Sequence, residues 1–316
     1  MRVLTLFAAA LLAFPAHAQT WPAKPVRIIV PFAPGGGSDF IARFTAQRLT
    51  EGLGRQVIVE NRPGAGGLLG IEVGVRSEAD GYTLVLIASS YTVNPALYKL
   101  KFDPLLDITP VVQLSQGPML VVINPKVPAG SAAELIKLAK AKPGTLNFAS
   151  AGQGSITHMA CELFAHMAGI KLNHVPYKGT GPALTDTIGG QTDLLCASTA
   201  TALAHVKSGR LKALAVTTAA RLPSEPEIPT LAESGVKGYD VPIWHGLIGP
   251  KGLPRAVVEK VNAEANKLLK AKETAEQLQT DGVSPAGGSA EAFRRRIEAE
   301  ITLWRKVVAS TGIKAE

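Results

Sequence analysis

The sequence is poor in cysteine and in long apolar runs, and each shortage excludes a class of protein. Two cysteines in 316 residues are too few for a fold held together by a disulfide framework. Beyond residue 18, no stretch of about 18 residues is free of polar interruption, so no ordinary transmembrane helix is expected there. What remains is a hydrophobic content of 46%, with 31 glycines and 22 prolines, which is typical of a globular α/β protein.

The common catalytic and nucleotide-binding motifs are also missing. The glycines at 35–37 are not followed by Gly-Lys-Ser/Thr, and Phe40 stands where a dinucleotide fingerprint needs a glycine. Neither a G-x-S-x-G elbow nor an H-E-x-x-H motif occurs. We therefore expect no enzymatic activity, no catalytic residue and no cofactor, and a secreted hydrolase is the weaker alternative.

Three side chains have the spacing of a metal site. His158, Glu162 and His166 stand at i, i+4 and i+8 of a predicted helix at 155–168. The outer two lie about 12 Å apart along the helix axis, which is too far for one tetrahedral ion. His158 and Cys161 could instead form a base and a nucleophile, but no third orienting residue is identifiable. We expect no metal and interpret the three side chains as a structural stripe.

The two cysteines fall in different predicted elements. Cys161 lies in the helix at 155–168, and Cys196 lies in an apolar strand at 193–198. Pairing in an oxidising compartment is one alternative. The placement favours two buried free thiols.

The first eighteen residues resemble an export signal. Arg2 precedes an apolar run from Val3 to Phe14, and Ala16-His17-Ala18 forms an A-x-A cleavage site. We expect cleavage before Gln19 and a periplasmic protein. The cleavage point has no cysteine that could carry a lipid anchor.

A formal net charge of +8 is compatible with an anionic ligand, but the charge is spread along the chain. The densest basic cluster, Arg294 to Arg296, stands in a predicted helix at 290–309. The apolar stripe of that helix contains Phe293, Ile297, Ile301, Trp304 and Val308. We interpret the arginines as the solvated face of the helix and expect no nucleic-acid partner.

Short β-branched runs alternate with helical patterns from residue 26 to residue 249, and two helices follow. This alternation predicts an α/β fold with parallel sheets and helices on both faces. Proline-containing segments near 124–125 and within 221–229 mark candidate domain boundaries. They predict a discontinuous first domain, 22–123 plus 235–316, and a second domain, 124–234. No strand is expected after Gly249. A chain that crosses between domains twice predicts a hinged cleft.

A strand, a glycine-rich turn and a helix follow one another at two places. Residues 28–39 read Ile-Ile-Val-Pro-Phe-Ala-Pro-Gly-Gly-Gly-Ser-Asp, and residues 147–158 read Asn-Phe-Ala-Ser-Ala-Gly-Gln-Gly-Ser-Ile-Thr-His. Glycines allow a close backbone approach, and the first turn of a helix offers free N–H groups to an anion. Each turn could be only a tight connection. Two on opposite lobes favour a pair of anion-binding loops facing one cleft, and a third glycine cluster, at 63–67, also precedes a helix.

Taken together and in order, the motifs of the chain resemble those of the periplasmic receptors of tripartite tricarboxylate transporters, called Bug or TctC-type proteins. The resemblance covers essentially the whole chain after the signal. It rests on segments 30–39, 59–67, 80–83, 94–97, 147–155, 175–179, 189–193, 209–216 and 244–246. It implies a two-lobed type II periplasmic-binding-protein fold and a small organic acid as ligand, whether a mono-, di- or tricarboxylate and including aromatic acids.

The resemblance also implies the site residues. The loops at 32–39 and 150–155 would grip the ligand from opposite lobes, with the carboxylate held by backbone amides, hydroxyls and ordered waters. Asp39 would orient a water or a ligand donor, and Ser89 and Ser90 would line the cleft at a variable wall position that bears on ligand choice. The predicted ligand-binding residues are Phe32, Ala33, Gly36, Ser38, Asp39, Ser89, Ser90, Ser150, Gly152, Gly154, Ser155, Tyr177, Ser198 and Thr199.

The expected partners are integral membrane subunits of a transporter, with a membrane sensor kinase as the alternative, and the receptor is expected to be a monomer. Cys161 departs from the family, which often has a glycine there. Lys178 either attracts an anion at the cleft edge or points to solvent. Asp193 is expected to cap a turn, and a hinge or core role is favoured for Trp244 over stacking on the ligand.

Overall fold

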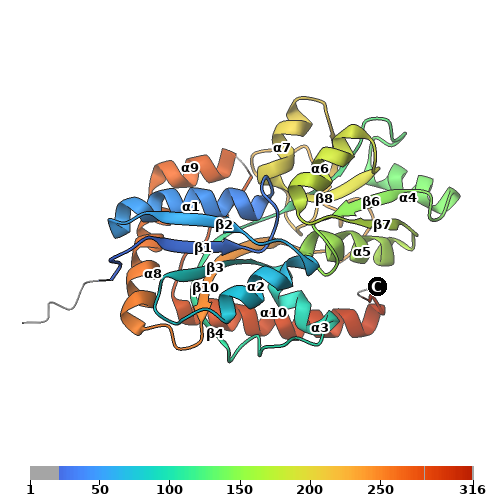
Figure 1. The fold of residues 1–316 in the computed structure, drawn as a ribbon. Helices are drawn as coiled ribbons and strands as arrows, with labels where there is room; N and C mark the ends of the chain where they lie inside the picture. Colours follow the sequence, from blue (N-terminus) through green and yellow to red (C-terminus); the bar gives the residue numbers. More distant parts are fainter. Residues whose placement is uncertain (1–20, 281, 315–316) are drawn as a thin grey trace, which may run out of the picture.

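A computed structural model describes residues 21–280 and 282–314, which form two lobes, each built around one β-sheet (Figure 1). The predicted signal at residues 1–18 lies outside the described residues. The first sheet has the strand order β11-β4-β10-β3-β1-β2. Its strands are β1 (Val26–Val30), β2 (Val57–Asn61), β3 (Thr83–Ala88), β4 (Ile108–Gly117), β10 (Ile243–Pro250) and β11 (Ser284–Pro285).

The second sheet has the strand order β7-β6-β8-β5-β9. Its strands are β5 (Met119–Ile123), β6 (Asn147–Ser150), β7 (Asn173–Pro176), β8 (Leu194–Ser198) and β9 (Lys212–Val216). We call the first sheet with its helices the first lobe, and the second sheet with its helices the second lobe.

Both sheets are mixed, which corrects the prediction of parallel sheets. β1 pairs in parallel with β2 and β3, whereas β10 runs antiparallel to β3 and β4. In the second lobe, β5 runs antiparallel to β8 and β9. Parallel neighbours need a crossover connection, usually through a helix, whereas β5 and β10 each enter their sheet directly from the other lobe. The short β11, which pairs with β4, corrects the expectation of no strand after Gly249.

The chain crosses between the lobes at places that differ from the predicted boundaries. β5 follows β4 directly, so residues 119–123 belong to the second sheet rather than to the predicted first domain. Tyr239 Oη donates to the Ala160 carbonyl of α5 over 2.7 Å, and Val241 N donates to the Thr217 carbonyl after β9 over 2.7 Å. The crossings therefore lie at Pro118 and just before β10.

The helices cover both faces of each sheet, as predicted (Figure 1). None of those described between residues 21 and 314 is long and apolar enough to cross a membrane. The first lobe has α1 (Gly37–Leu53), a short 3₁₀ turn (Ala65–Gly67), α2 (Leu68–Val75), α3 (Ser90–Leu97), α8 (Arg255–Lys270), α9 (Lys272–Thr280) and α10 (Ala290–Thr311). The second lobe has α4 (Ala132–Ala141), α5 (Ile156–Ala168), α6 (Thr180–Gly189) and α7 (Thr199–Lys207).

Alternation along β3 shows how one strand serves two cores. Leu84 and Leu86 pack in the cluster that contains α1 and α8, whereas Val85 and Ile87 pack in the cluster that contains α2 and α10. Successive side chains of a strand point to opposite faces of the sheet. All four are fully buried, so the strand is hydrophobic throughout, as a strand covered by helices on both faces must be.

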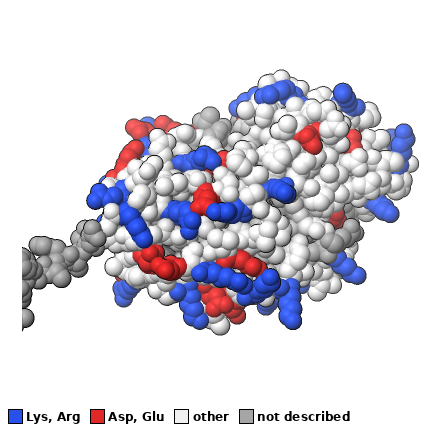
Figure 2. All heavy atoms as spheres, in the orientation of Figure 1, with Lys and Arg blue, Asp and Glu red and all other residues white. Residues whose placement is uncertain are grey.

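Helix α10 confirms the predicted apolar stripe and corrects the interpretation of its arginines. Arg295 is exposed, but Arg294 donates to the Leu105 carbonyl over 2.9 Å. Arg296 bonds Glu300 (2.9 Å), and its guanidinium lies 5.4 Å from the centre of the Trp244 ring. Two of the three arginines therefore tie α10 to the first lobe. Elsewhere Lys and Arg lie scattered over both lobes, with acidic residues among them (Figure 2).

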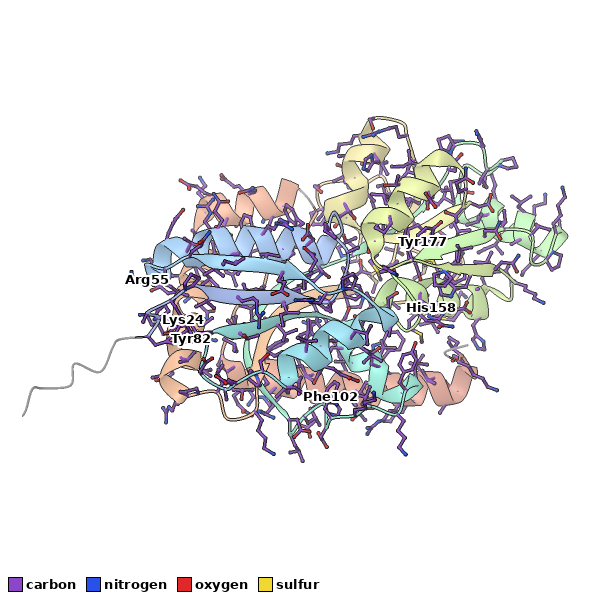
Figure 3. The ribbon with its side chains drawn as sticks, in the orientation of Figure 1. Lys24, Arg55, Tyr82, Phe102, His158 and Tyr177 are labelled. Atoms are coloured by element: carbon purple, nitrogen blue, oxygen red, sulfur yellow. A yellow bond between two sulfur atoms is a disulfide. The ribbon has the colours of Figure 1, made fainter. Side chains whose placement is uncertain are left out.

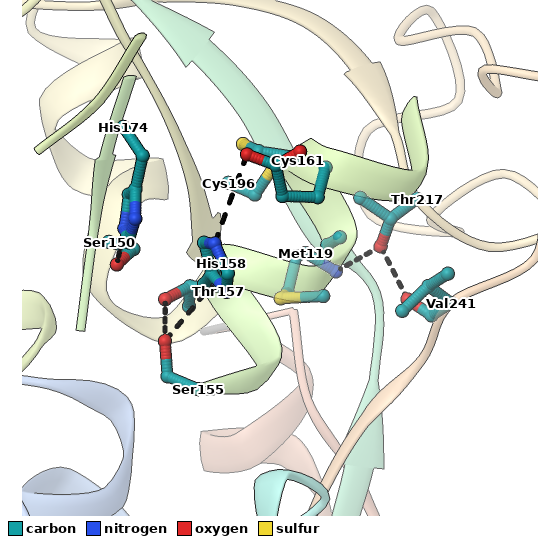
Figure 4. Close-up of a disulfide and its surroundings, with 12 residues drawn as sticks. Met119, Ser150, Ser155, Thr157, His158, Cys161, His174, Cys196, Thr217 and Val241 are labelled. Atoms are coloured by element: carbon teal, nitrogen blue, oxygen red, sulfur yellow. Dashed lines mark hydrogen bonds and ion pairs between the residues drawn. A yellow bond between two sulfur atoms is a disulfide. The ribbon is translucent and has the colours of Figure 1, made fainter. Parts of the chain in front are cut away.

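Cys161 and Cys196 form a disulfide, so the prediction of two free thiols was wrong (Figure 4). Their Cα atoms lie 6.0 Å apart, within the range that a disulfide spans. The helix and the strand were assigned correctly, but their side-by-side packing depends on the tertiary fold. The disulfide joins the helix that follows the second glycine loop to the strand that ends at Ser198.

Candidate functional site

A cavity with an empty volume of about 360 Å³ lies between the lobes. Both lobes contribute to it, and none of its lining side chains is charged. The first lobe supplies Phe32, Gly36, Gly37, Ser38, Ala88, Ser90 and Ile243, and the second supplies Ala151, Ser155, Ile156, Thr157, Thr180 and Ser198.

Five helices begin at this cavity, because α1, α3, α5, α6 and α7 each have a lining residue at their first or second helical position or at the N-cap. Of their N-cap residues, Ser155 accepts a side-chain hydrogen bond from the His158 N–H, whereas Gly36, Ser89, Gly179 and Ser198 form no side-chain cap. The N-terminus of a helix offers unpaired N–H groups and a partial positive charge. The cavity is therefore suited to an anion although it has no basic side chain.

Glycines allow the two lobes to come this close. A Cβ on Gly37 would lie 2.5 Å from Ser198 Oγ, across the boundary between the lobes. Gly66, in the third glycine cluster, has φ +60°, and a Cβ there would clash with the Gln153 carbonyl of the second lobe. Side chains at either position would hold the lobes apart.

Hydrogen bonds join the lobes around the cavity. Ala33 N donates to the Lys178 carbonyl over 2.9 Å. Thr199 Oγ1, from the start of α7, donates to the Gly282 carbonyl over 2.7 Å. Lys178 itself is exposed, which agrees with the alternative that this residue points to solvent. With these bonds in place, the structure has a closed cleft.

Asp39 turns away from the cavity and holds the first glycine loop in shape. Its Oδ2 accepts from Gly35 N (3.1 Å) and Arg43 Nε (3.0 Å), and its Oδ1 accepts from Asn61 Nδ2 (2.9 Å). Burial alone would raise the pKa of Asp39, but these three hydrogen bonds outweigh it and lower the pKa below its ordinary value. The carboxylate is fully engaged by the protein, so Asp39 supports the loop and does not face the cavity.

The second glycine loop is held by uncharged side chains (Figure 4). Ser150 Oγ lies 2.6 Å from His174 Nε2 and accepts from Gly152 N over 3.0 Å. His158 Nδ1 accepts from Gly154 N over 3.3 Å, and the rings of His158 and His174 stack at 4.0 Å. Burial lowers the pKa of His174 to about 4, and burial with the neighbouring His174 lowers that of His158 to about 3. Both rings are therefore neutral at neutral pH.

Six of the fourteen predicted site residues line the cavity: Phe32, Gly36, Ser38, Ser90, Ser155 and Ser198. The other eight do not line it: Ala33, Asp39, Ser89, Ser150, Gly152, Gly154, Tyr177 and Thr199. Tyr177, labelled in Figure 3, donates to Asp186 over 2.6 Å, and burial together with that bond raises its pKa to about 12. These residues shape or close the loops around the cavity.

Sequence reasoning missed several lining residues, and two of them had a visible signal. Thr157 stands two residues after Ser155 in the motif at 147–158, and Thr180 directly follows the family motif at 175–179. Ala88, Ala151, Ile156 and Ile243 are apolar, and nothing in the sequence separates them from core residues.

The side chains of Trp244, Asp193 and His158 have structural roles. Trp244 is buried and its Nε1 donates to Glu300 over 2.7 Å, which confirms a core role. Asp193 accepts from Asn147 N over 2.7 Å and so fixes the start of β6. His158 Nε2 lies 3.8 Å from Glu162 Oε1. Among residues 21–280 and 282–314, no group of three or more His, Cys, Asp or Glu is arranged to hold a metal ion.

The fold and the cavity are those of a two-lobed binding protein with a cleft between its lobes. Comparison with known proteins agrees with this class. The model of the tripartite tricarboxylate transporter family receptor matches residues 41–313. Protein BugT of Bordetella pertussis is 37% identical over 318 residues, covering 99% of this chain and 98% of BugT.

Solved structures are similar over nearly the whole chain. R. palustris Rpa4515 with adipate has a TM-score of 0.90 at 34% identity, covering 93% of this chain and 99% of that one. MatC from Rhodopseudomonas palustris with bound malate has a TM-score of 0.87 at 30% identity, and the match covers 91% of this chain and 100% of MatC. The chain belongs to the tripartite tricarboxylate transporter receptor family, a family of periplasmic binding proteins and not of enzymes.

Proposed function

We propose that this chain captures a small organic carboxylate in the cavity between its lobes and presents the closed form to the membrane subunits of a tripartite transporter. The observation that carries the proposal is a cavity without charged side chains at which five helices begin. Backbone N–H groups and helix dipoles stabilise a carboxylate there without an arginine. The bound adipate and malate of the two similar structures support the same ligand class.

Transport follows from a shift between open and closed forms. A ligand that bonds the loops of both lobes favours the closed form by as much as it binds that form more tightly. Membrane subunits that recognise the closed surface would then engage loaded receptors. Residues 1–18, with their A-x-A site, would direct export to the compartment in which such a receptor meets its solute.

Calorimetry and thermal unfolding with a panel of mono-, di- and tricarboxylates test the proposal. At 100 times Kd, a ligand that binds only the folded receptor should stabilise it by about 2.7 kcal/mol. If no carboxylate in the panel binds or stabilises the protein, the proposed ligand class is wrong.

A matched pair of glycine variants in α6 tests closure. A Cβ on Gly181 would clash with the Pro34 carbonyl of the first lobe, whereas a Cβ on Gly189 meets no atom within 4 Å. Gly181→Ala should weaken carboxylate binding about fivefold or more, since overpacking costs about 1–3 kcal/mol. Gly189→Ala should leave the affinity unchanged, and equal affinities for the two variants would contradict binding by closure.

A further inference from the structure

A second, smaller cavity adjoins the first and has room for about one water-sized group. We call it the inner compartment. It shares Gly37, Ser198 and Ile243 with the main cavity, and its polar lining residues include Ser115, Gln116 and His245. Gly37 and Ser198 belong to different lobes, so the wall between the two cavities is itself a contact between lobes.

His245 is a buried side chain with one ring nitrogen unused. It stands in β10, opposite Ala88 of β3 and Ser115 of β4, and is 3% exposed. Its Nδ1 lies 3.1 Å from Ser115 Oγ, while its Nε2 has no hydrogen-bond partner within residues 21–280 and 282–314. An unpaired polar atom in the interior costs free energy, so it calls for a partner.

The ring lies at the wall between the two cavities. Its Cε1, the carbon bonded to both nitrogens, is 3.9 Å from the position of a Cβ on Gly37. Gln116 Oε1 is already occupied, because it accepts from Arg296 over 2.8 Å. His245 Nε2 is buried without a partner within residues 21–280 and 282–314, so it is a polar atom that a ligand atom in the inner compartment could satisfy.

The surroundings of His245 decide what it can bind. Burial lowers the pKa of His245 to about 4, so the ring is neutral at neutral pH and offers one hydrogen bond. The lining residues of the compartment include no charged side chain, and Ile41, Ile243 and Val283 make part of it apolar. Such a site suits one oxygen atom at the end of a short carbon chain and rejects a methyl group, which would leave Nε2 unpaired.

We propose that His245 binds a second oxygen-bearing group of the ligand, remote from the carboxylate held at the helix N-termini. The receptor then prefers hydroxy acids and dicarboxylates over simple alkanoates of equal length. This inference rests on the proposed function, because it assumes that a carboxylate occupies the main cavity.

The experiment compares acids of matched length by calorimetry: butanoate, 4-hydroxybutanoate and succinate, and hexanoate, 6-hydroxyhexanoate and adipate. In the wild-type receptor, the best oxygen-bearing acid should bind about tenfold or more tightly than the alkanoate of its length. His245→Leu should bring that ratio close to one, mainly by weakening the oxygen-bearing acid. The hydroxy acid and the dicarboxylate show separately whether a hydroxyl or a carboxyl oxygen is preferred.

Two further variants control for folding and chemistry. His245→Gln keeps a hydrogen-bonding group near the position of Nε2 and should retain more of the preference than His245→Leu. His166→Leu removes an exposed histidine of α5 that lines neither cavity and should change nothing. The ¹⁵N shift of His245 Nε2 in the wild-type protein needs no variant, and it should move with the oxygen-bearing acid and not with the alkanoate.

The results distinguish a failure of the proposed function from a failure of the role of His245. If no acid binds the wild-type receptor, the proposed function fails and this inference fails with it. If acids bind but His245→Leu leaves the ratio unchanged, or weakens all acids equally, the carboxylate receptor stands and the role of His245 is wrong. An ordered water on Nε2 in a ligand complex, with the ligand's second oxygen elsewhere, would also overturn it.

Discussion

The loop at 32–39 is held in shape by charged side chains, whereas the loop at 150–155 is held by uncharged side chains in the interior. Asp39 and Arg43 support the first loop from its partly exposed side. Two stacked neutral histidines and a nearby disulfide support the second. The same strand–turn–helix unit can thus be stabilised by ion pairing or by burial, and the two solutions respond differently to pH and to reduction.

Removing the disulfide, which joins α5 to β8 in the second lobe, should give the largest effect. The Cys161→Ala/Cys196→Ala variant should lose about 2–5 kcal/mol of unfolding free energy, because the cross-link restricts the unfolded chain. Urea unfolding measures the loss. Reduction of the wild-type protein should approach the same value, and the reductant should leave the double variant unaffected. An unchanged midpoint would show that the second loop does not depend on the cross-link.

Acidification should weaken the second loop before the first. A histidine whose pKa is lowered on folding contributes stability that is complete above its unfolded value of about 6.5 and is lost as the pH falls toward the folded value. For His174 that folded value is about 4. The lowered pKa of Asp39 keeps its contribution until the pH falls below its ordinary value of 3.8.

The unfolding free energy should therefore fall below pH 6.5, by about 1.4 kcal/mol per pH unit for each such histidine. His174→Phe keeps an aromatic ring beside Phe148. Between pH 4.5 and 6, the slope of unfolding free energy against pH should be smaller in this variant by about 1.4 kcal/mol per pH unit, which corresponds to one proton. His245, whose pKa burial also lowers to about 4, continues to titrate in both proteins. Urea unfolding at a series of pH values measures the slope, and equal slopes would contradict the assignment.

Asp39→Asn should have the smallest effect and should act on the first loop. The carboxylate accepts hydrogen bonds from three N–H donors. An asparagine must turn its NH₂ group toward at least one of these donors, and that hydrogen bond is lost. We expect a loss of about 1–2 kcal/mol of unfolding free energy. Glu51→Gln, an exposed change near the other end of α1, should stay within about 0.5 kcal/mol of wild type. Similar losses in both variants would mean that general charge, and not the loop contacts, is responsible.

The sequence predicted the class of fold and the place of the site more successfully than the details of either. Hydrophobic periodicity and glycine position are local properties, so the alternating elements and the two loops at 32–39 and 150–155 could be recognised. The disulfide, the direction of β5 and the orientation of Asp39 depend on which elements become neighbours. Asp39 and Ser38 are adjacent in the sequence and equally polar, yet only Ser38 lines the cavity, because Arg43 and Asn61 attract the carboxylate to the other side.

The hydrophobic core is continuous between the lobes, and this gives temperature a part in receptor function. Trp304 of α10, Val93 of α3 and Ile243 of β10 share one buried cluster with Met119, Ile156 and Tyr239. An opening motion that separates these side chains brings apolar surface into contact with water, which raises the heat capacity. Hydrophobic attraction weakens on cooling. From this contribution alone, we expect cooling to shift the ligand-free receptor toward the open form.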